Sequence, residues 1–111
     1  MFKLVRKTVL LCSLIFVIPS SFAANTWHTS TIKSIYPVSN GDFIIIFNNS
    51  SICSDKNQYH RVTVGSNSVK IEGAEKMYSA ALAAAAMGKT ISINFDSSTS
   101  HCFINRLKVN Y

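Results

Sequence analysis

The chain has 111 residues, of which 48% are hydrophobic, and its formal net charge is +6. This length suits one small domain rather than several. Three of the eleven lysines and arginines lie within residues 1–23, so eight basic and five acidic residues leave a charge of +3 on the remainder. Those eight positive residues are scattered and form no basic run, which argues against a nucleic-acid partner.

Residues 1–23 have the pattern of a secretory signal peptide. Three basic residues come first, followed by an uncharged apolar run over residues 8–18 and the small-x-small cleavage pattern Ser21-Phe22-Ala23. The apolar run is too short to span a bilayer, and no second run follows it. We therefore predict a mature single domain over residues 24–111, a secreted or periplasmic location, and no membrane anchor after cleavage.

Cys53 and Cys102 are the only cysteines in residues 24–111. An even pair in an oxidising compartment indicates one disulfide rather than a metal site or a nucleophile. A bridge that closes a loop of this length contributes about 3–4 kcal/mol in the chain-entropy account. We therefore predict one Cys53–Cys102 disulfide that fastens a small domain.

Three strands are expected in the first half of the mature chain. Residues 27–36 are rich in Thr, Ile and Tyr, and residues 43–47 form a continuous apolar run, which we interpret as a strand buried on both faces. The turn residues Asn40 and Gly41 lie between these segments, so the two strands should form a hairpin. Residues 59–64 alternate between polar and apolar side chains and predict a third strand.

One helix and two more strands are expected in the second half. Residues 74–87 are rich in good helix formers, and Gly88 suits the left-handed residue that ends a helix. Strands should follow over residues 90–95 and 102–111, both of which alternate. The helix side chains predicted to pack on the sheet are Met77, Tyr78, Ala81, Leu82 and Ala85.

The predicted element order, β-β-β-α-β-β, is that of the OB-fold, a small five-stranded Greek-key barrel. Other α+β arrangements share this order. The sequence therefore predicts a mainly β domain with one helix, organised as an OB-fold-like five-stranded barrel or as a curved sheet.

The stretch from Met77 to Ile93 combines an aromatic-x-x-x-Leu helix (Tyr78 and Leu82), a glycine stop (Gly88) and an alternating strand. In these features it resembles the subtilase cytotoxin B-subunit family, and the resemblance is strongest over roughly the last forty residues. The resemblance implies small exported OB-fold proteins that form rings of five, bind sialylated cell-surface glycans and carry a catalytic subunit. It thus implies a homo-oligomer, with a glycan and an exported protein subunit as partners.

The same resemblance implies where a sugar would bind. In the family, a hydroxyl on the first strand and a tyrosine on the strand after the helix contribute to the sugar site. The first-strand hydroxyl corresponds here to Thr29 or Ser30, with the register left open, and the later tyrosine is replaced by Phe95. This departure matters because a phenylalanine ring can stack on a sugar but cannot donate a hydrogen bond to it.

Residues for catalysis are not grouped in this sequence. No pair of carboxylates has a spacing that places it across a cleft, and no serine lies in a GxSxG turn. His28, His60 and His101 are not clustered and lack the usual spacing of metal ligands. We therefore expect neither an enzyme nor a metal site or other cofactor.

Two functions remain from the sequence. The first is an exported non-catalytic binding module, in particular a glycan-binding protein like a toxin B-subunit. The alternative is a periplasmic protein-interaction, inhibitor or immunity-type protein without a sugar site. An exposed aromatic residue beside hydroxyl groups would favour the first, and Trp27, Tyr36 and Tyr59 are the candidates.

Overall fold

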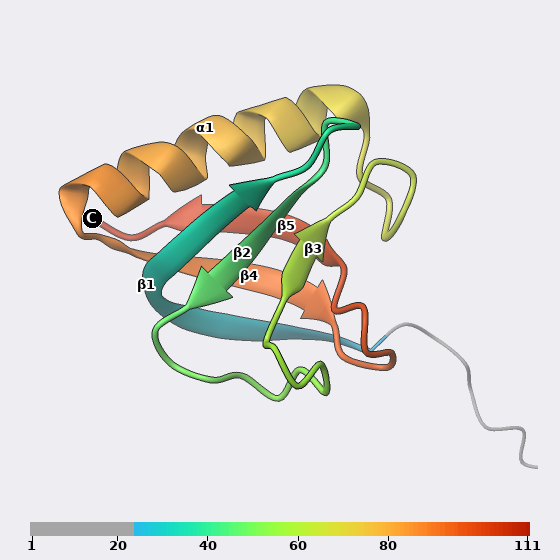
Figure 1. The fold of residues 1–111 in the computed structure, drawn as a ribbon. Coiled ribbons are helices and arrows are strands. Elements are labelled where there is room, and N and C mark those ends of the chain that lie inside the picture. Colours follow the sequence, from blue (N-terminus) through green and yellow to red (C-terminus); the bar gives the residue numbers. More distant parts are fainter. Residues whose placement is uncertain (1–23) are drawn as a thin grey trace, which may run out of the picture.

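Strand β1 (Asn25–Pro37) is the common member of two antiparallel pairings in the computed structural model, which describes residues 24–111 (Figure 1). Its first half pairs with strand β4 (Thr90–Asp96) and its second half with strand β2 (Phe43–Phe47). The register shifts between Ile32 and Ser34, and such a shift bends a strand. One long bent strand therefore serves both halves of the sheet. The signal peptide predicted over residues 1–23 lies outside the described residues.

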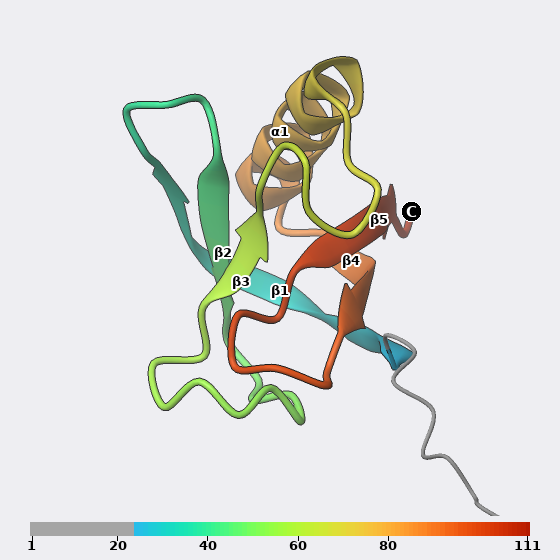
Figure 2. The same cartoon turned by 90° about the vertical axis from the view of Figure 1, so that its right-hand side faces the viewer.

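Two short strands complete a five-stranded antiparallel sheet in the order β3-β2-β1-β4-β5. Strand β3 spans His60–Val62 and strand β5 spans Ile104–Val109, so both are shorter than the predicted segments. The two edges of the sheet approach each other, because an isolated parallel bridge joins Arg61 to Phe103 (Figure 2). The prediction of a mainly β domain with one helix and the order β-β-β-α-β-β is confirmed.

Helix α1 (Ile71–Met87) lies between β3 and β4 in the chain and packs across the sheet (Figure 1). It begins three residues before the predicted start at residue 74, so Gly73 lies within its first turn. Gly88 ends it as predicted, with a left-handed φ of 66° and with hydrogen bonds from its own N–H to Ala85 and from that of Lys89 to Ala84.

The packed face of α1 differs in part from the predicted one. Leu82 is 45% exposed and Ala85 is also exposed, so their assignment to the packed stripe was wrong. The buried positions instead follow the spacing of about three to four residues that places side chains on one helix face. They are Ala74, Ala81 and Ala84, with Met77 and Tyr78 partly buried against the core. Alanines at the closest positions let the helix backbone lie near the sheet.

Alternate residues of β2 and β4 supply most of the core. The inward set of β2 is Phe43, Ile45 and Phe47, and that of β4 is Ile91, Ile93 and Phe95. The prediction that β2 is buried on both faces was wrong, because Ile44 and Ile46 remain partly exposed. Its outer face is therefore an apolar surface that contacts solvent.

The predicted disulfide is present. Cys53 follows β2 and Cys102 precedes β5, and their sulfur atoms are bonded, with the Cα atoms 5.9 Å apart. Both cysteines are buried. The bond therefore joins the long loop before β3 to the turn before β5. Among the described residues, no helix has both the length and the apolar character needed to cross a bilayer.

Candidate functional site

Six side chains form a polar surface on the outside of β1, β4 and β5. Because side chains alternate along a strand, Ser92 and Asn94 lie on the face opposite the inward Ile91, Ile93 and Phe95. Neighbouring groups cover both, so Ser92 is only 5% and Asn94 only 6% exposed. The strand registers then place these residues in two rows across the three strands. One row is Trp27, Asn94 and Arg106, and the next is Thr29, Ser92 and Lys108. We call these six residues the Trp27 face.

The indole of Trp27 is the largest accessible group on this face. The residue is 51% exposed, and the ammonium group of Lys108 lies 5.8 Å from the centre of its ring. A cation at this distance is attracted to the face of an indole. The ring is thus oriented by a neighbour while much of its surface remains open to a ligand.

Hydroxyl and amide groups beside Trp27 are linked to one another. Thr29 Oγ1 and Ser92 Oγ are 2.6 Å apart, and the side-chain amide of Asn110 donates to Ser92 Oγ and to Thr90 Oγ1 at 3.1 Å each. A hydroxyl can take part in up to three hydrogen bonds, so the exposed Thr29 hydroxyl keeps capacity for a ligand. The network fixes this hydroxyl on a rigid strand.

The charge of the Trp27 face is positive. Arg106 and Lys108 are both exposed, and Arg106 Nε donates to the side chain of Asn105 at 2.9 Å. Asp96 lies at the end of β4, where its carboxylate accepts hydrogen bonds from the hydroxyl and the backbone N–H of Ser98. The hydroxyl bond is the main cause that lowers the pKa of Asp96, while burial opposes it. Two cations therefore flank the polar rows, and the carboxylate at the strand end is already engaged.

The structure separates the three residues implied as a sugar site. Thr29 lies on the Trp27 face and is exposed. Ser30, the next residue, points inward, donates to the carbonyl of Thr31 and accepts from the N–H of Asn49. Phe95 is fully buried in the core, so its ring does not reach a ligand in this structure. The alternation of β1 therefore favours Thr29 over Ser30 as a surface hydroxyl.

The other members of the Trp27 face were not singled out from the sequence. Ser92 and Asn94 stand at the polar positions of an alternating strand, and Arg106 and Lys108 do the same in the last strand. That alternation was the available signal. The missing information was the register, which places these two pairs beside β1.

A second surface lies on the outside of β1, β2 and β3. The register places Tyr36 beside Ile44, and Ile44 beside Arg61. The rings of Tyr36 and Tyr59 meet edge to face with centroids 5.7 Å apart, and the guanidinium carbon of Arg61 lies 5.5 Å from the Tyr59 ring centre. The nearness of Tyr36 is the main cause that raises the pKa of Tyr59. We call Tyr36, Ile44, Tyr59 and Arg61 the Tyr36 patch.

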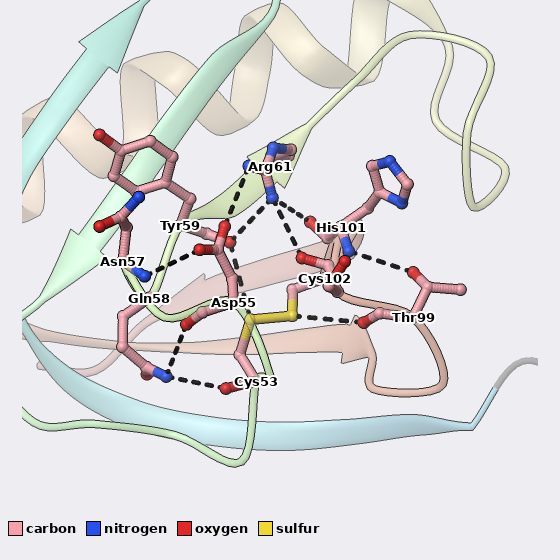
Figure 3. Close-up of polar contacts among 10 residues, drawn as sticks. Cys53, Asp55, Asn57, Gln58, Tyr59, Arg61, Thr99, His101 and Cys102 are labelled. Atoms are coloured by element: carbon pink, nitrogen blue, oxygen red, sulfur yellow. Dashed lines mark hydrogen bonds and ion pairs between the residues drawn. A yellow bond between two sulfur atoms is a disulfide. The ribbon is translucent and has the colours of Figure 1, made fainter.

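The guanidinium of Arg61, within this patch, is already bonded to other residues of the same chain (Figure 3). Its guanidinium donates to the carbonyls of Ser100 at 3.3 Å and of His101 at 3.0 Å, and pairs with Asp55 at 3.0 Å. Its backbone N–H donates to the carbonyl of Cys102 at 3.2 Å. Arg61 therefore holds the turn before β5 against β3, beside the disulfide.

The interior contains a Ser–His pair that invites comparison with a catalytic dyad. Ser51 Oγ lies 2.7 Å from His60 Nε2, but His60 is fully buried and its burial lowers its pKa to about 4. Its Nδ1 is the only buried side-chain nitrogen or oxygen of the described residues without a hydrogen-bond partner. A catalytic base needs an accessible position, a pKa near the working pH and a group that orients its other nitrogen. His60 has none of the three.

No enclosed site for chemistry is found within residues 24–111. This part of the chain has no pocket and no group of three or more His, Cys, Asp or Glu side chains placed to hold a metal ion. Comparison of the chain with protein-family models, with curated proteins and with solved structures gives no match.

Proposed function

We propose that the protein is an exported, non-catalytic binding module that holds a glycan on the Trp27 face. The observation that carries this proposal is the half-exposed indole of Trp27, one row along β1 from the Thr29 hydroxyl. A sugar ring presents an apolar C–H face and an edge of hydroxyls. The indole complements the first, and the exposed hydroxyl of Thr29 complements the second, held in place by the buried Ser92.

The two cations of the Trp27 face favour a negatively charged glycan over a neutral one. Arg106 offers a planar donor group and Lys108 a compact ammonium, and both are exposed. A sugar that carries a carboxylate would interact with these groups while it stacks on Trp27. The resemblance to the subtilase cytotoxin B-subunit family supports an acidic glycan of this kind.

The same proposal includes the architecture of the sheet. An OB-like barrel would close the order β3-β2-β1-β4-β5 by bringing β5 beside β3. The parallel bridge between Arg61 and Phe103, the Arg61 hydrogen bonds and the Cys53–Cys102 disulfide all act across that gap. These contacts support a partly open barrel over a merely curved sheet.

Export is also part of the proposal. The pattern of residues 1–23 supports a signal peptide, and a buried disulfide supports an oxidising compartment outside the cytoplasm. An open surface site binds one sugar weakly, so several copies in a ring would raise the overall affinity by multivalency. Light scattering of the purified protein would test for such a ring directly.

A glycan array tests the proposed function, with two single variants that serve as controls for each other. Trp27→Ala removes the indole from the Trp27 face, and Tyr36→Ala removes an aromatic ring of comparable exposure, 44% against 51%, from the other surface. We expect the unmodified protein and Tyr36→Ala to bind the same acidic glycans, and Trp27→Ala to lose them. Binding to no glycan, or equal binding by all three proteins, would refute the proposal.

A protein partner is the second candidate, and it is favoured by the Tyr36 patch. Tyr36 is 44% exposed, and Val38 and Val64 near it are 39% and 40% exposed. Tyrosine is enriched among the residues that contribute most to protein interfaces. Affinity capture from the native periplasm would test this candidate, since a specific partner should be lost with Tyr36→Ala and retained with Trp27→Ala.

A further inference from the structure

A buried histidine, His60, and a partly exposed one, His28, are both hydrogen-bonded to the same loop, residues 48–59, which we call the latch loop. His60 Nε2 is hydrogen-bonded to Ser51 Oγ at 2.7 Å, and His28 Nε2 lies 3.0 Å from the backbone carbonyl of Asn49. The two imidazole rings are parallel, with centroids 6.0 Å apart. One stacked pair thus anchors the beginning of the loop at two successive points.

Ser51 is also hydrogen-bonded to other residues of the latch loop. Its hydroxyl accepts from the N–H of Cys53 at 3.0 Å, and its N–H donates to the side-chain oxygen of Gln58 at 2.8 Å. The amide nitrogen of Gln58 donates in turn to the carbonyl of Cys53 at 2.8 Å. The loop is therefore closed on itself around the residue that His60 holds.

The surroundings of His60 suit a neutral ring only. Its edge contacts are the rings of Phe47 on β2, at 5.1 Å, and Phe95 on β4, at 5.0 Å, and neither carries a charge. The backbone of Ile45 and of Gln58 favours a proton on the ring, but burial of the charge in this apolar interior is the larger effect and lowers the pKa of His60.

The titratable and charged groups near His60 do not provide a dedicated counter-ion. From β1 it faces His28, which opposes a second positive charge, and from the latch loop Asp55 attracts one. Asp55 is already paired with Arg61 of β3, and the remaining neighbour on the chain is Tyr59, which is neutral at these pH values. The balance therefore disfavours the imidazolium as long as the loop stays closed.

We infer that the latch loop is released by acid: a charged His60 is disfavoured in the apolar interior, so uptake of a proton favours an open form in which the ring is hydrated and residues 48–59 leave the sheet. The Cys53–Cys102 disulfide keeps the released loop attached beside β5. Opening would uncover Phe47 and the His60 ring, which are buried in the closed form. This inference concerns regulation and does not depend on the identity of any ligand.

The pH window follows from the direction of the shift. Burial lowers the pKa of His60 from 6.5 to about 4, so the closed form takes up the proton less readily than the open form. The population of the open loop is then constant above about pH 6.5, rises as the pH falls, and levels off below about pH 4. For one proton, linkage gives roughly a fiftyfold rise in this population between about pH 7 and 4.5.

Hydrogen exchange of the exported, disulfide-linked protein tests the inference. Protection factors, corrected for the intrinsic effect of pH on exchange, should fall roughly fiftyfold for the Ser51 and Cys53 amides between about pH 7 and 4.5. The amides of Ala81 and Ala84 in α1 should keep their protection. A parallel fall in the helix would mean global unfolding and would overturn the inference.

Two variants make the test specific. His60→Phe keeps an aromatic ring in the same space and should remove the pH dependence of the latch-loop amides. His101→Phe changes an exposed histidine that stacks on Phe103 and should leave that dependence intact. Should His60→Phe fail to fold, NMR titration of the His60 imidazole in the unmodified protein takes its place. A pH dependence that persists in His60→Phe, or a His60 ring that titrates near 6.5 with the loop closed, contradicts the inference.

Discussion

Cys53 is bonded to Cys102, and the bond lies next to the single parallel bridge that joins β3 to the chain entering β5. These two cysteines are 49 residues apart in the chain, so the bond closes a long loop at the point where the two edges of the sheet meet. The disulfide thus strengthens the sheet where only the Arg61–Phe103 bridge pairs its two edges.

Removal of this disulfide should reduce stability substantially. The variant Cys102→Ala should lower the free energy of unfolding by about 2–5 kcal/mol, because the unfolded chain regains the freedom that the bond removes. Urea denaturation measures this change, and the double variant Cys53→Ala, Cys102→Ala controls for the effect of a free thiol. Mass spectrometry of non-reduced peptides should show the linked pair, and two free thiols in periplasmically expressed protein would contradict this prediction.

Arg61 should matter through its carbonyl contacts more than through its ion pair. Arg61→Met removes the charged donor to the carbonyls of Ser100 and His101 together with the ion pair to Asp55, so it should cost about 1–3 kcal/mol of unfolding free energy. Asp55→Asn removes only a partly exposed ion pair and keeps the oxygen that accepts from Asn57, so it should cost less than about 1 kcal/mol. Equal losses in the two variants, measured by urea denaturation, would be inconsistent with this division.

The helix contact should be sensitive to size at its buried alanines. Ala81 is fully buried, so Ala81→Leu should overpack the space between α1 and the sheet and cost about 1–3 kcal/mol. Ala83 is exposed on the same helix, and Ala83→Leu should be close to neutral because alanine and leucine have similar helix propensities. Thermal unfolding of both variants compares them directly, and a neutral Ala81→Leu would place that face in solvent.

The comparison of α1 with its prediction shows which information a sequence pattern lacks. Composition was enough to find the helix, and Gly88 marked its end, because both depend on local backbone preferences. The packed stripe was partly wrong, since in an alanine-rich helix hydrophobicity does not distinguish the faces. Leu82 looked like a core residue from its type, whereas the sheet contact selects Ala84 through its position.

The candidate sites show the same limit at the level of the sheet. Alternation predicted most strands, and the family resemblance implied Thr29 or Ser30 as a site hydroxyl, but only the register decides which of the two faces outward. The burial of His60 also depends on tertiary contacts, because Phe47, Phe95 and His28 come from three different strands. The strand over residues 27–36 and its hairpin with β2 were predicted, but the pairing of β1 with β4 was not, since it is not a local property.

The charge of the Trp27 face should appear as a salt-dependent affinity. For an acidic glycan, Lys108→Gln should weaken binding several-fold at low salt, and the loss should shrink as salt screens the interaction. Lys89→Gln changes an exposed lysine just after α1 and should leave affinity unchanged. Isothermal titration at two salt concentrations makes this measurement, and a salt-independent loss with Lys108→Gln would point to its contact with the Trp27 ring instead.

Trp27 is the only tryptophan in the chain, so its fluorescence reports on the proposed binding surface without a label. The most direct measurement is a titration of the unmodified protein with an acidic glycan identified on the array, followed through tryptophan emission and its quenching by iodide. If the glycan covers the half-exposed indole, emission should shift to shorter wavelength and quenching should fall with the same dissociation constant as binding heat. Binding heat without any change in Trp27 emission or quenching would contradict the assignment of the glycan to this face.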